Sequence, residues 1–172
     1  TPPLLDWLEG YFGRPYPYDK LNQIAMPSSF CCALENAAAI TYDEFILLMD
    51  ESSPLAQRRI YTYVHAHELA HMWFGDLVTP AWWDDIWLNE AFASWMMYKA
   101  SNAVWPEGEF ERAMLKDGLG AMAADSLAAA RQIREPVLVD AEINNIFDGI
   151  TYDKGGQVIS MMEAYVGEET FR

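Results

Sequence analysis

The first apolar residues of the chain follow a helical spacing. Residues 3–12 carry leucines and a phenylalanine three or four positions apart, which predicts a short helix that Gly13 ends. The prolines within residues 14–18 predict an extended or turning segment, because a proline disfavours the α conformation in the residue before it. The chain is therefore expected to leave its first helix before any strand begins.

Alternating and continuous apolar runs then predict strands up to residue 50. Residues 21–26 alternate loosely and predict a strand, while residues 37–42 and 45–49 predict a hairpin or two more strands. Residues 30–36 favour no single state. We expect a small sheet in this part of the chain.

The spacing becomes helical again after residue 50. Ser53 and Pro54 predict the start of a long helix, with a capping hydroxyl before a proline at the first helical position. Gly75 suits a left-handed cap and predicts the end of this helix. Residues 77–83 are expected to connect it to the next one.

A second long helix is expected from Asp84 or Asp85, whose carboxylates suit the positive end of a helix. Large apolar side chains at helical spacing predict its buried face: Leu88, Phe92, Trp95 and Met96. The later segments are a helical region over residues 106–133 broken at 118–120, an irregular or extended stretch over 137–147, and an amphipathic helix over 153–166 that Gly167 ends. The buried face of this last helix is expected to hold Val158, Ile159, Met162, Tyr165 and Val166.

Strands thus come first and helices dominate afterwards, which is the pattern of an α+β fold. With 172 residues, 52% of them hydrophobic and 14% aromatic, the chain can form a substantial core and is not disordered. We expect one domain or part of one, with a sheet-rich part over residues 1–50 and a helical part over residues 51–172.

Acidic residues outnumber basic ones, and the formal net charge is −15. A nucleic-acid partner would require a basic patch, so this class of function is excluded. Most of the charge is expected to be a solvated acidic surface, which would mildly favour cationic substrates such as a protonated peptide amine.

The two cysteines, Cys31 and Cys32, are adjacent, and a disulfide between neighbours is strained and crosslinks little of the chain. They indicate either a reducing compartment such as the cytoplasm or thiols that carry no information on the compartment. No run of about 20 apolar residues predicts a membrane span, and no signal peptide is visible. Because the chain starts at Thr1 without methionine and stops at Arg172 without an evident terminus, we expect a piece of a longer protein.

Candidate metal ligands lie within the long helix expected after Pro54. His67, Glu68 and His71 form the pattern H-E-x-x-H, in which the histidines lie about 40° apart on one helix face. Two such imidazoles can share a zinc ion, and Glu68 beside them can reach a water that the metal activates. His65 lies about 200° around the helix from His67, so we expect a partly exposed structural histidine there.

A third ligand follows in the next helix. Glu90 comes after 18 intervening residues, and two histidines with one carboxylate make a catalytic zinc set with a fourth position open. A metzincin would need glycine at position 74 and histidine at position 77, where this chain has Phe74 and Leu77, so that class is excluded. The alternative, core histidines and a surface carboxylate, would require the three residues to agree in spacing by accident.

These residues resemble the aminopeptidase N family of gluzincins, which are zinc exopeptidases with a thermolysin-like catalytic domain. The segments that carry the resemblance are Y-F-G-R-P-Y-P at residues 11–17, C-A-L-E-N at 32–36, H-E-L-A-H-M-W-F-G-D at 67–76, W-W-D-D-I-W-L-N-E-A-F-A-S-W at 82–95 and I-T-Y-D-K-G at 150–155. The second of them resembles the family's G-A-M-E-N exopeptidase motif. The resemblance covers essentially the whole chain, and its segments occur in the family's order.

The resemblance implies a role for each matching residue near the metal. His67, His71 and Glu90 would bind one zinc ion per chain, and Glu68 would be the general base. Tyr152 would donate its hydroxyl to the oxyanion that develops during hydrolysis. The fold that the resemblance implies is the thermolysin-like one, a small sheet followed by a mainly helical lobe.

The C-A-L-E-N segment would hold the substrate. Glu35 would bind its free α-amino group, which is what makes such an enzyme an exopeptidase. Cys32, Ala33 and Asn36 would bind the peptide backbone as an added strand. Two positions depart from the family, since Cys32 replaces its usual glycine and Ala37 its usual tryptophan. A Cβ at position 32 would reshape the pocket for the first substrate residue.

We therefore expect a zinc aminopeptidase that hydrolyses the N-terminal peptide bond of peptides with a free N-terminus. The family's N-terminal β-rich domain and C-terminal helical domain are expected outside this chain. The alternatives are a gluzincin endopeptidase, a non-catalytic scaffold of the same family, and an added epoxide hydrolase activity.

Overall fold

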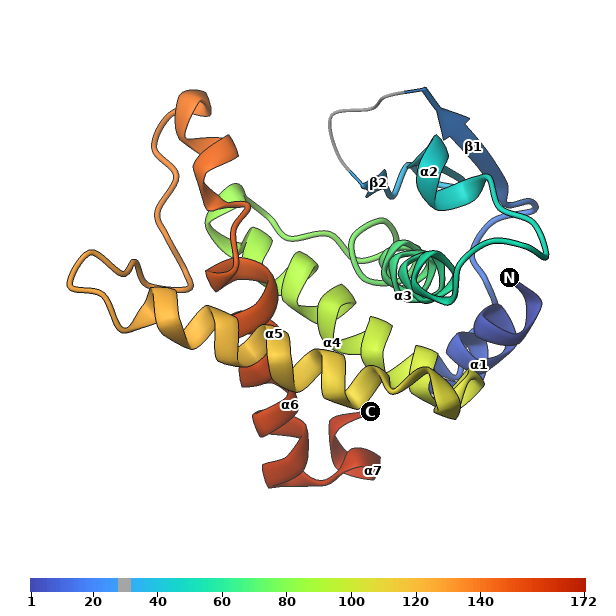
Figure 1. Ribbon diagram of the computed structural model, residues 1–172. Coiled ribbons are helices and arrows are strands. Elements are labelled where there is room, and N and C mark those ends of the chain that lie inside the picture. Colours follow the sequence, from blue (N-terminus) through green and yellow to red (C-terminus); the bar gives the residue numbers. More distant parts are fainter. Residues whose placement is uncertain (28–31) are drawn as a thin grey trace.

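The structure, a computed structural model, describes residues 1–27 and 32–172. A small sheet lies beside a larger helical lobe, and α3 runs between them (Figure 1). The helices are α1 (Pro2–Phe12), α2 (Glu44–Leu47), α3 (Leu55–His71), α4 (Ile86–Val104), α5 (Phe110–Asp125), α6 (Gly155–Val166) and α7 (Glu168–Phe171). The α+β class expected from the sequence is confirmed. Within the described ranges, no helix has the length and apolar character that crossing a membrane requires.

The sheet contains β1 (Asn22–Met26), β2 (Ala33–Leu34) and β3 (Ala39–Asp43) in the order β1-β3-β2. β3 is parallel to β1 and antiparallel to β2. The strands predicted over residues 21–26 and 37–42 are confirmed. Part of the ambiguous segment before residue 37 forms β2, and Cys31 lies outside the described residues.

The strand predicted over residues 45–49 is wrong, because this segment begins as the short helix α2. The carboxylate of Asp43 accepts a hydrogen bond from the backbone N–H of Phe45 at 2.8 Å and caps the helix. Ile46 is buried while Phe45 is exposed, so the apolar run is not a buried strand.

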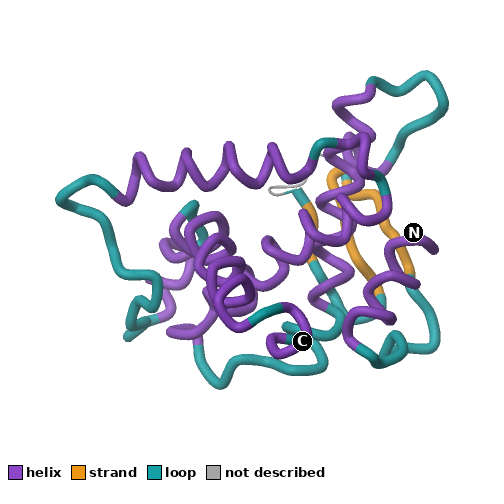
Figure 2. Tube along the Cα trace, turned by 90° about the horizontal axis from the view of Figure 1, so that it is seen from below, coloured by secondary structure: helices purple, strands orange, loops and turns teal. Residues whose placement is uncertain are grey.

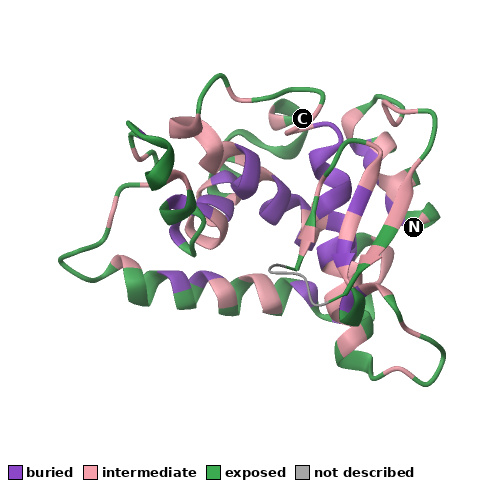
Figure 3. Cartoon of the chain, turned by 90° about the horizontal axis from the view of Figure 1, so that it is seen from above, coloured by how far each residue is buried: buried purple, intermediate pink, exposed green. Residues whose placement is uncertain are grey.

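The core is centred on α3 and α4, which pack against each other more extensively than any other pair of elements. Alanines without exposed surface recur on these two helices: Ala66, Ala70, Ala91, Ala93 and Ala100. Small side chains let two helices approach closely, and larger ones such as Leu69, Trp95 and Met96 fill the space around them. Buried positions gather on these helices and on β3 (Figure 3).

The ends of α3 differ from the prediction. Ser53 does not cap it, because its hydroxyl accepts a hydrogen bond from the backbone N–H of Asp50 at 2.9 Å. The helix ends at His71, so Gly75 is not its cap. Gly75 has a φ of +141°, and a Cβ there would lie 2.4 Å from Oδ1 of Asn89. This glycine therefore permits the connector to pass close to α4.

The aspartates before α4 also have partners other than the helix. Asp85 occupies the N-cap position without a capping hydrogen bond, and its carboxylate pairs instead with Arg134 at 2.7 Å. Asp84 accepts a hydrogen bond from the backbone N–H of Val137 at 2.8 Å. The predicted N-cap position of Asp85 is confirmed, but neither aspartate makes the capping hydrogen bond, because the loop after α5 supplies their donors.

α5 is continuous through both of its glycines, so the predicted break is wrong. A Cβ at Gly118 would lie 2.9 Å from the side chain of Gln157 on α6, which explains a glycine inside this helix. The helix ends at Asp125, short of the predicted residue 133. The chain then forms a long loop at the side of the lobe (Figure 2).

A π-helical turn, Ile150–Lys154, precedes α6, and a 3₁₀ segment, Asp140–Ile146, lies in the stretch that was expected to be irregular. The buried residues of α6 lie in its first part, where Gly155 and Gly156 pack on α4 and Ile159 joins the core, while Glu163 further along pairs with Lys99 of α4. The predicted buried face is wrong in its second half. Met162, Tyr165 and Val166 remain exposed there, Tyr165 by 90%.

His65 is fully buried, which corrects the expected partial exposure. Its Nδ1 lies 2.6 Å from the hydroxyl of Tyr42 on β3, and its Nε2 lies 3.0 Å from the hydroxyl of Thr1. The ring also stacks on Tyr61. Burial lowers the pKa of His65 to about 3. This neutral histidine ties the sheet to α3 and takes no part in a metal cluster of the described residues.

Two glycine-to-alanine substitutions should change stability in opposite directions. Gly155→Ala would place a Cβ 2.6 Å from Cβ of Ala91, so we expect a loss of about 1–3 kcal/mol from overpacking. Gly120→Ala meets nothing within 4 Å inside α5 and should add about 0.5–1 kcal/mol. Urea denaturation of both variants measures these changes. A stabilised Gly155→Ala variant would contradict the packing described.

His65 should make the protein sensitive to acid. Its pKa is lower in the folded state than the ordinary 6.5, so the unfolded chain binds the extra proton between pH 6.5 and about 3. The stabilisation is present above pH 6.5 and is lost as the pH falls. Relative to His65→Gln, the unfolding free energy of the wild type should fall by about 1.4 kcal/mol per pH unit in this window. Parallel pH dependences in urea melts of the two proteins would show that His65 does not contribute.

Candidate metal centre

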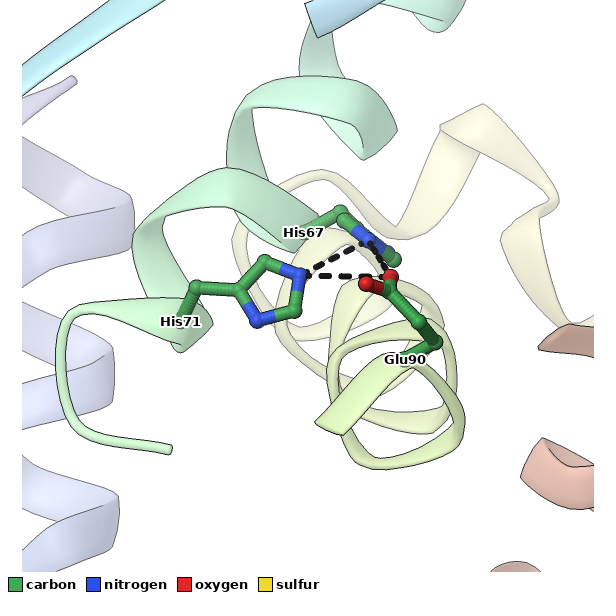
Figure 4. Close-up of side chains that lie close together, drawn as sticks. All are labelled: His67, His71 and Glu90. Atoms are coloured by element: carbon green, nitrogen blue, oxygen red, sulfur yellow. Dashed lines mark hydrogen bonds and ion pairs between the residues drawn. The ribbon is translucent and has the colours of Figure 1, made fainter. Parts of the chain in front are cut away.

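Three side chains converge where the end of α3 meets the beginning of α4 (Figure 4). Nε2 of His67 lies 3.1 Å from Nε2 of His71. Oε2 of Glu90 lies 3.3 Å from the first of these atoms and 3.5 Å from the second. A tetrahedral zinc ion with bonds of about 2.0–2.1 Å separates its ligand atoms by about 3.3 Å. The three residues can therefore hold a zinc ion with little movement.

Neighbouring groups orient the ligand atoms toward this point. Nδ1 of His71 lies 3.2 Å from the carbonyl oxygen of Phe74, where its N–H donates and leaves the lone pair of Nε2 facing the cluster. The side-chain amide of Asn89 donates to Oε1 of Glu90 at 3.2 Å, which leaves Oε2 for a metal. Gly75 lies against both Asn89 and His71. The connector thus orients His71, and the first turn of α4 orients Glu90.

Burial and mutual charge determine the protonation of the cluster. Burial lowers the pKa of His67. Burial also acts to lower the pKa of His71, but the hydrogen bond and charge of Glu90 outweigh it and raise this pKa to about 9. The histidines in turn hold the pKa of Glu90 well below its ordinary value in spite of its burial. A divalent cation would replace the shared proton and neutralise the carboxylate.

Glu68 projects from α3 beside the cluster and is 5% exposed. Burial, reinforced by the charges of Glu35 and Glu90 and opposed by that of His71, raises its pKa to about 8. Among the described residues it accepts no hydrogen bond and forms no ion pair. One carboxylate oxygen each of Glu35 and Glu68 and a ring nitrogen of His71 lie within 4.8 Å of one another. Glu35 therefore reaches the immediate surroundings of the metal site.

A cavity of about 720 Å³ opens beside the three ligands. This volume suits a small ligand or the end of a peptide. The residues that were predicted to bind substrate and that line it are Cys32, Ala33 and Glu35, and Glu68 and Tyr152 line it as well. Asn36 is exposed and donates to the hydroxyl of Thr41 at 3.4 Å, so it does not join them.

Tyr152 enters the cavity from the π-helical turn before α6. Its ring stacks on that of His67 with centroids 6.0 Å apart and an interplanar angle of 30°. Phe147, another residue of the cavity wall, lies beside it with centroids 6.5 Å apart. The structure therefore brings the predicted tyrosine to the predicted ligand set, although the two are far apart in the sequence.

Sequence reasoning assigned no role to Asn89, Asp76 or Arg131. Asn89 directly precedes Glu90, and this adjacency is the one signal that pointed to it. Burial and the charge of Glu35 raise the pKa of Asp76 to about 6 in the cavity wall. Arg131 contacts the turn that carries Tyr152, and nothing in the local pattern of its loop indicates this.

Comparison with known proteins agrees with this geometry. The profile of the peptidase family M1 domain matches residues 1–172. Over 170 residues the chain is 46% identical to Probable aminopeptidase 1 of Sulfurisphaera tokodaii, which covers 98% of this chain and 22% of that protein. It is 43% identical over 169 residues to Leucyl aminopeptidase of Saccharolobus solfataricus, with the same coverages. It is 42% identical over 170 residues to Aminopeptidase M1 of Arabidopsis thaliana, covering 98% of the chain and 19% of that protein. The chain thus spans about a fifth of the length of these curated relatives.

Zinc should bind with a stoichiometry of one and stabilise the protein, since a ligand of the folded state raises the melting temperature. His71→Ala and Glu90→Ala should each abolish stoichiometric zinc, measured by elemental analysis after dialysis, together with the increase in melting temperature. His65→Gln is the matched control, because His65 is a buried histidine of the same helix outside the cluster, and it should retain the metal. Full zinc content in the His71→Ala variant would refute this ligand set.

Proposed function

This chain belongs to peptidase family M1, and from that premise we propose that the whole protein is a zinc aminopeptidase. Its reaction is hydrolysis of the N-terminal peptide bond of peptides with a free amino group. The observation that carries this proposal is the position of Glu35, whose carboxylate lies beside Glu68 and His71 at the edge of the metal site. A carboxylate there can pair with a protonated amine one residue away from the bond to be cleaved.

Zinc, when bound by His67, His71 and Glu90, supplies Lewis acidity to the scissile carbonyl and to water. Glu68 takes the proton from the attacking water and passes it to the leaving amine. Its carboxylate suits both steps, because burial holds its pKa near neutrality and no other donor among the described residues occupies it. The cation would lower this pKa and favour the basic form of Glu68 at the start of the reaction.

Tyr152 and Glu35 act on two different parts of the substrate. The hydroxyl of Tyr152 donates a hydrogen bond to the oxyanion as charge develops there. Glu35 accepts hydrogen bonds from the α-ammonium group and excludes acylated N-termini, which carry no charge to compensate its own. The three carboxylates Glu35, Glu68 and Glu90 also make the cavity attractive to cations.

The edge of the sheet provides a place for the peptide backbone. β2 lies at the end of the order β1-β3-β2, and Ala33 and Leu34 of this strand line the cavity. An extended peptide can pair with such an edge as an added strand, with Cys32 beside it. Cys32 is exposed at the cavity wall, so its thiol contributes to the pocket for the first substrate residue.

The test uses the full-length protein with fluorogenic amino-acid amides and their N-acetylated counterparts. We expect cleavage of the free amines alone. Glu68→Gln should lower kcat by about 10²–10⁴-fold with zinc retained. Glu35→Gln should raise KM for free amines by about tenfold or more, because a charge-assisted hydrogen bond contributes about 1.5–3 kcal/mol. Glu44→Gln, an exposed carboxylate outside the cavity, should change neither parameter.

Two results would contradict the proposed aminopeptidase function. Cleavage of acetylated substrates at similar rates would favour an endopeptidase of the same zinc class. Full zinc content with no turnover of any peptide amide by the full-length protein would favour a non-catalytic scaffold.

A further inference from the structure

A network of hydrogen bonds centred on Arg131 lies behind the cavity wall. Its guanidinium pairs with both carboxylate oxygens of Asp148, with Nη2–Oδ1 and Nε–Oδ2 distances of 2.5 and 3.1 Å. Nη2 also donates to the carbonyl oxygen of Ile146 at 3.0 Å and to the hydroxyl of Thr151 at 2.7 Å. Its side chain is 17% exposed, and its bonds to Ile146 and Thr151 are partly buried, while the pair with Asp148, whose side chain is 42% exposed, lies at the surface.

The partners of Arg131 in turn hold the π-helical turn. Oδ1 of Asp148 accepts hydrogen bonds from the backbone N–H groups of Ile150 and Thr151, at 2.9 and 3.1 Å. The hydroxyl of Thr151 donates to Ile146 at 2.5 Å, and this side chain is 1% exposed. Nη1 of Arg131 donates to the carbonyl oxygens of Gln132 and Ile133 in its own loop, and its other bonds reach the segment that immediately precedes Tyr152.

A turn of this kind needs such support. π-helical turns are rare, because their wider helical path is less favourable than the α path, and they recur at functional sites. The other side of this turn is fixed by Gly155, whose Cα faces Ala91 on α4. Arg131 supplies the opposing side from a loop. Tyr152 lies in this turn, and its ring stacks on that of His67.

We propose that Arg131 is a positioning residue for Tyr152. It holds the π-helical turn so that the tyrosine hydroxyl points toward the substrate carbonyl, while Arg131 itself is neither a metal ligand nor a lining residue of the cavity. This assignment rests on the proposed aminopeptidase function. A planar guanidinium is required, because its fork binds both oxygens of Asp148 and still reaches Ile146 and Thr151, which a single ammonium group cannot do.

The experiment uses the full-length protein with Arg131→Met, Asp148→Asn, Tyr152→Phe and the double variant Arg131→Met/Tyr152→Phe. Amide hydrogen exchange reports the turn, and kcat, KM and zinc content report the site. The matched control is Arg112→Met, which removes an exposed arginine from an ion pair with Glu109 on the surface of the lobe.

We expect exchange at residues 150–154 to be at least about tenfold faster in Arg131→Met and Asp148→Asn, with α3 and α4 unchanged. A displacement of about 1 Å in a catalytic group costs up to about a hundredfold in rate, so kcat should fall by about ten- to a hundredfold. KM should stay within about twofold, and zinc should be retained. Arg131→Lys should recover only part of kcat.

The double variant separates positioning from general stability. If Arg131 acts through Tyr152, Arg131→Met causes no further loss of kcat once Tyr152 is phenylalanine. An equal loss in both backgrounds would overturn the proposal, as would a raised KM with kcat retained.

Hydrogen exchange decides the structural part even if the full-length wild type cleaves no peptide. Absence of cleavage by the full-length wild type would refute the proposed aminopeptidase function but would not test the role of Arg131. Unchanged exchange at residues 150–154 would then still overturn the role of Arg131, and faster exchange confined to this turn would support it.

Discussion

The close packing of α3 against α4 determines the rest of the structure. Buried alanines on both helices bring their axes together, and the same crossing places His67 and His71 opposite Glu90. A larger side chain at this contact would separate the ligands as well as disrupt the core. The metal centre therefore forms part of the main packing contact of the lobe, and two rigid helices carry its three ligands.

The cost of this arrangement is electrostatic. Glu35, Glu68 and Glu90 all lie close to the buried ring of His71. Without a cation, their negative charges repel one another in a poorly hydrated space. The two carboxylates accommodate this charge differently. Burial raises the pKa of Glu68 and favours its protonated form, while hydrogen bonds to the two histidines lower the pKa of Glu90 and favour its charged form. Binding of a divalent cation removes most of the repulsion. Metal affinity and the basicity of Glu68 thus arise from the same cluster.

The sequence predicts the ligand set because, in a helix, the spacing of two residues determines the directions in which their side chains point. The spacing of His67 and His71 and the helix that carries Glu90 are local properties, and the structure has them where they were expected. The predictions that were wrong concern residues whose hydrogen bonds or packing depend on partners far away in the sequence. Asp85 pairs with Arg134 instead of capping α4, and Gly118 continues α5 because Gln157 of α6 lies against it.

The burial of His65 and the contacts of Arg131 could not be predicted for the same reason. Helical direction alone showed that His65 could not join the metal, but its burial depends on Tyr42 and Thr1. Arg131 lies in a loop without periodicity, and its partners Ile146, Asp148 and Thr151 lie 15, 17 and 20 residues further along the chain.

The short connection between α3 and α4 has a consequence for the order of folding. Contacts that are close in the sequence form rapidly, because little chain entropy is lost in closing the loop between them. The two ligand helices can therefore meet, and a cation can bind, before Tyr152 arrives from a segment much later in the chain. Formation of the metal site and the arrival of Tyr152 beside it can therefore be separate events in the assembly of the fold.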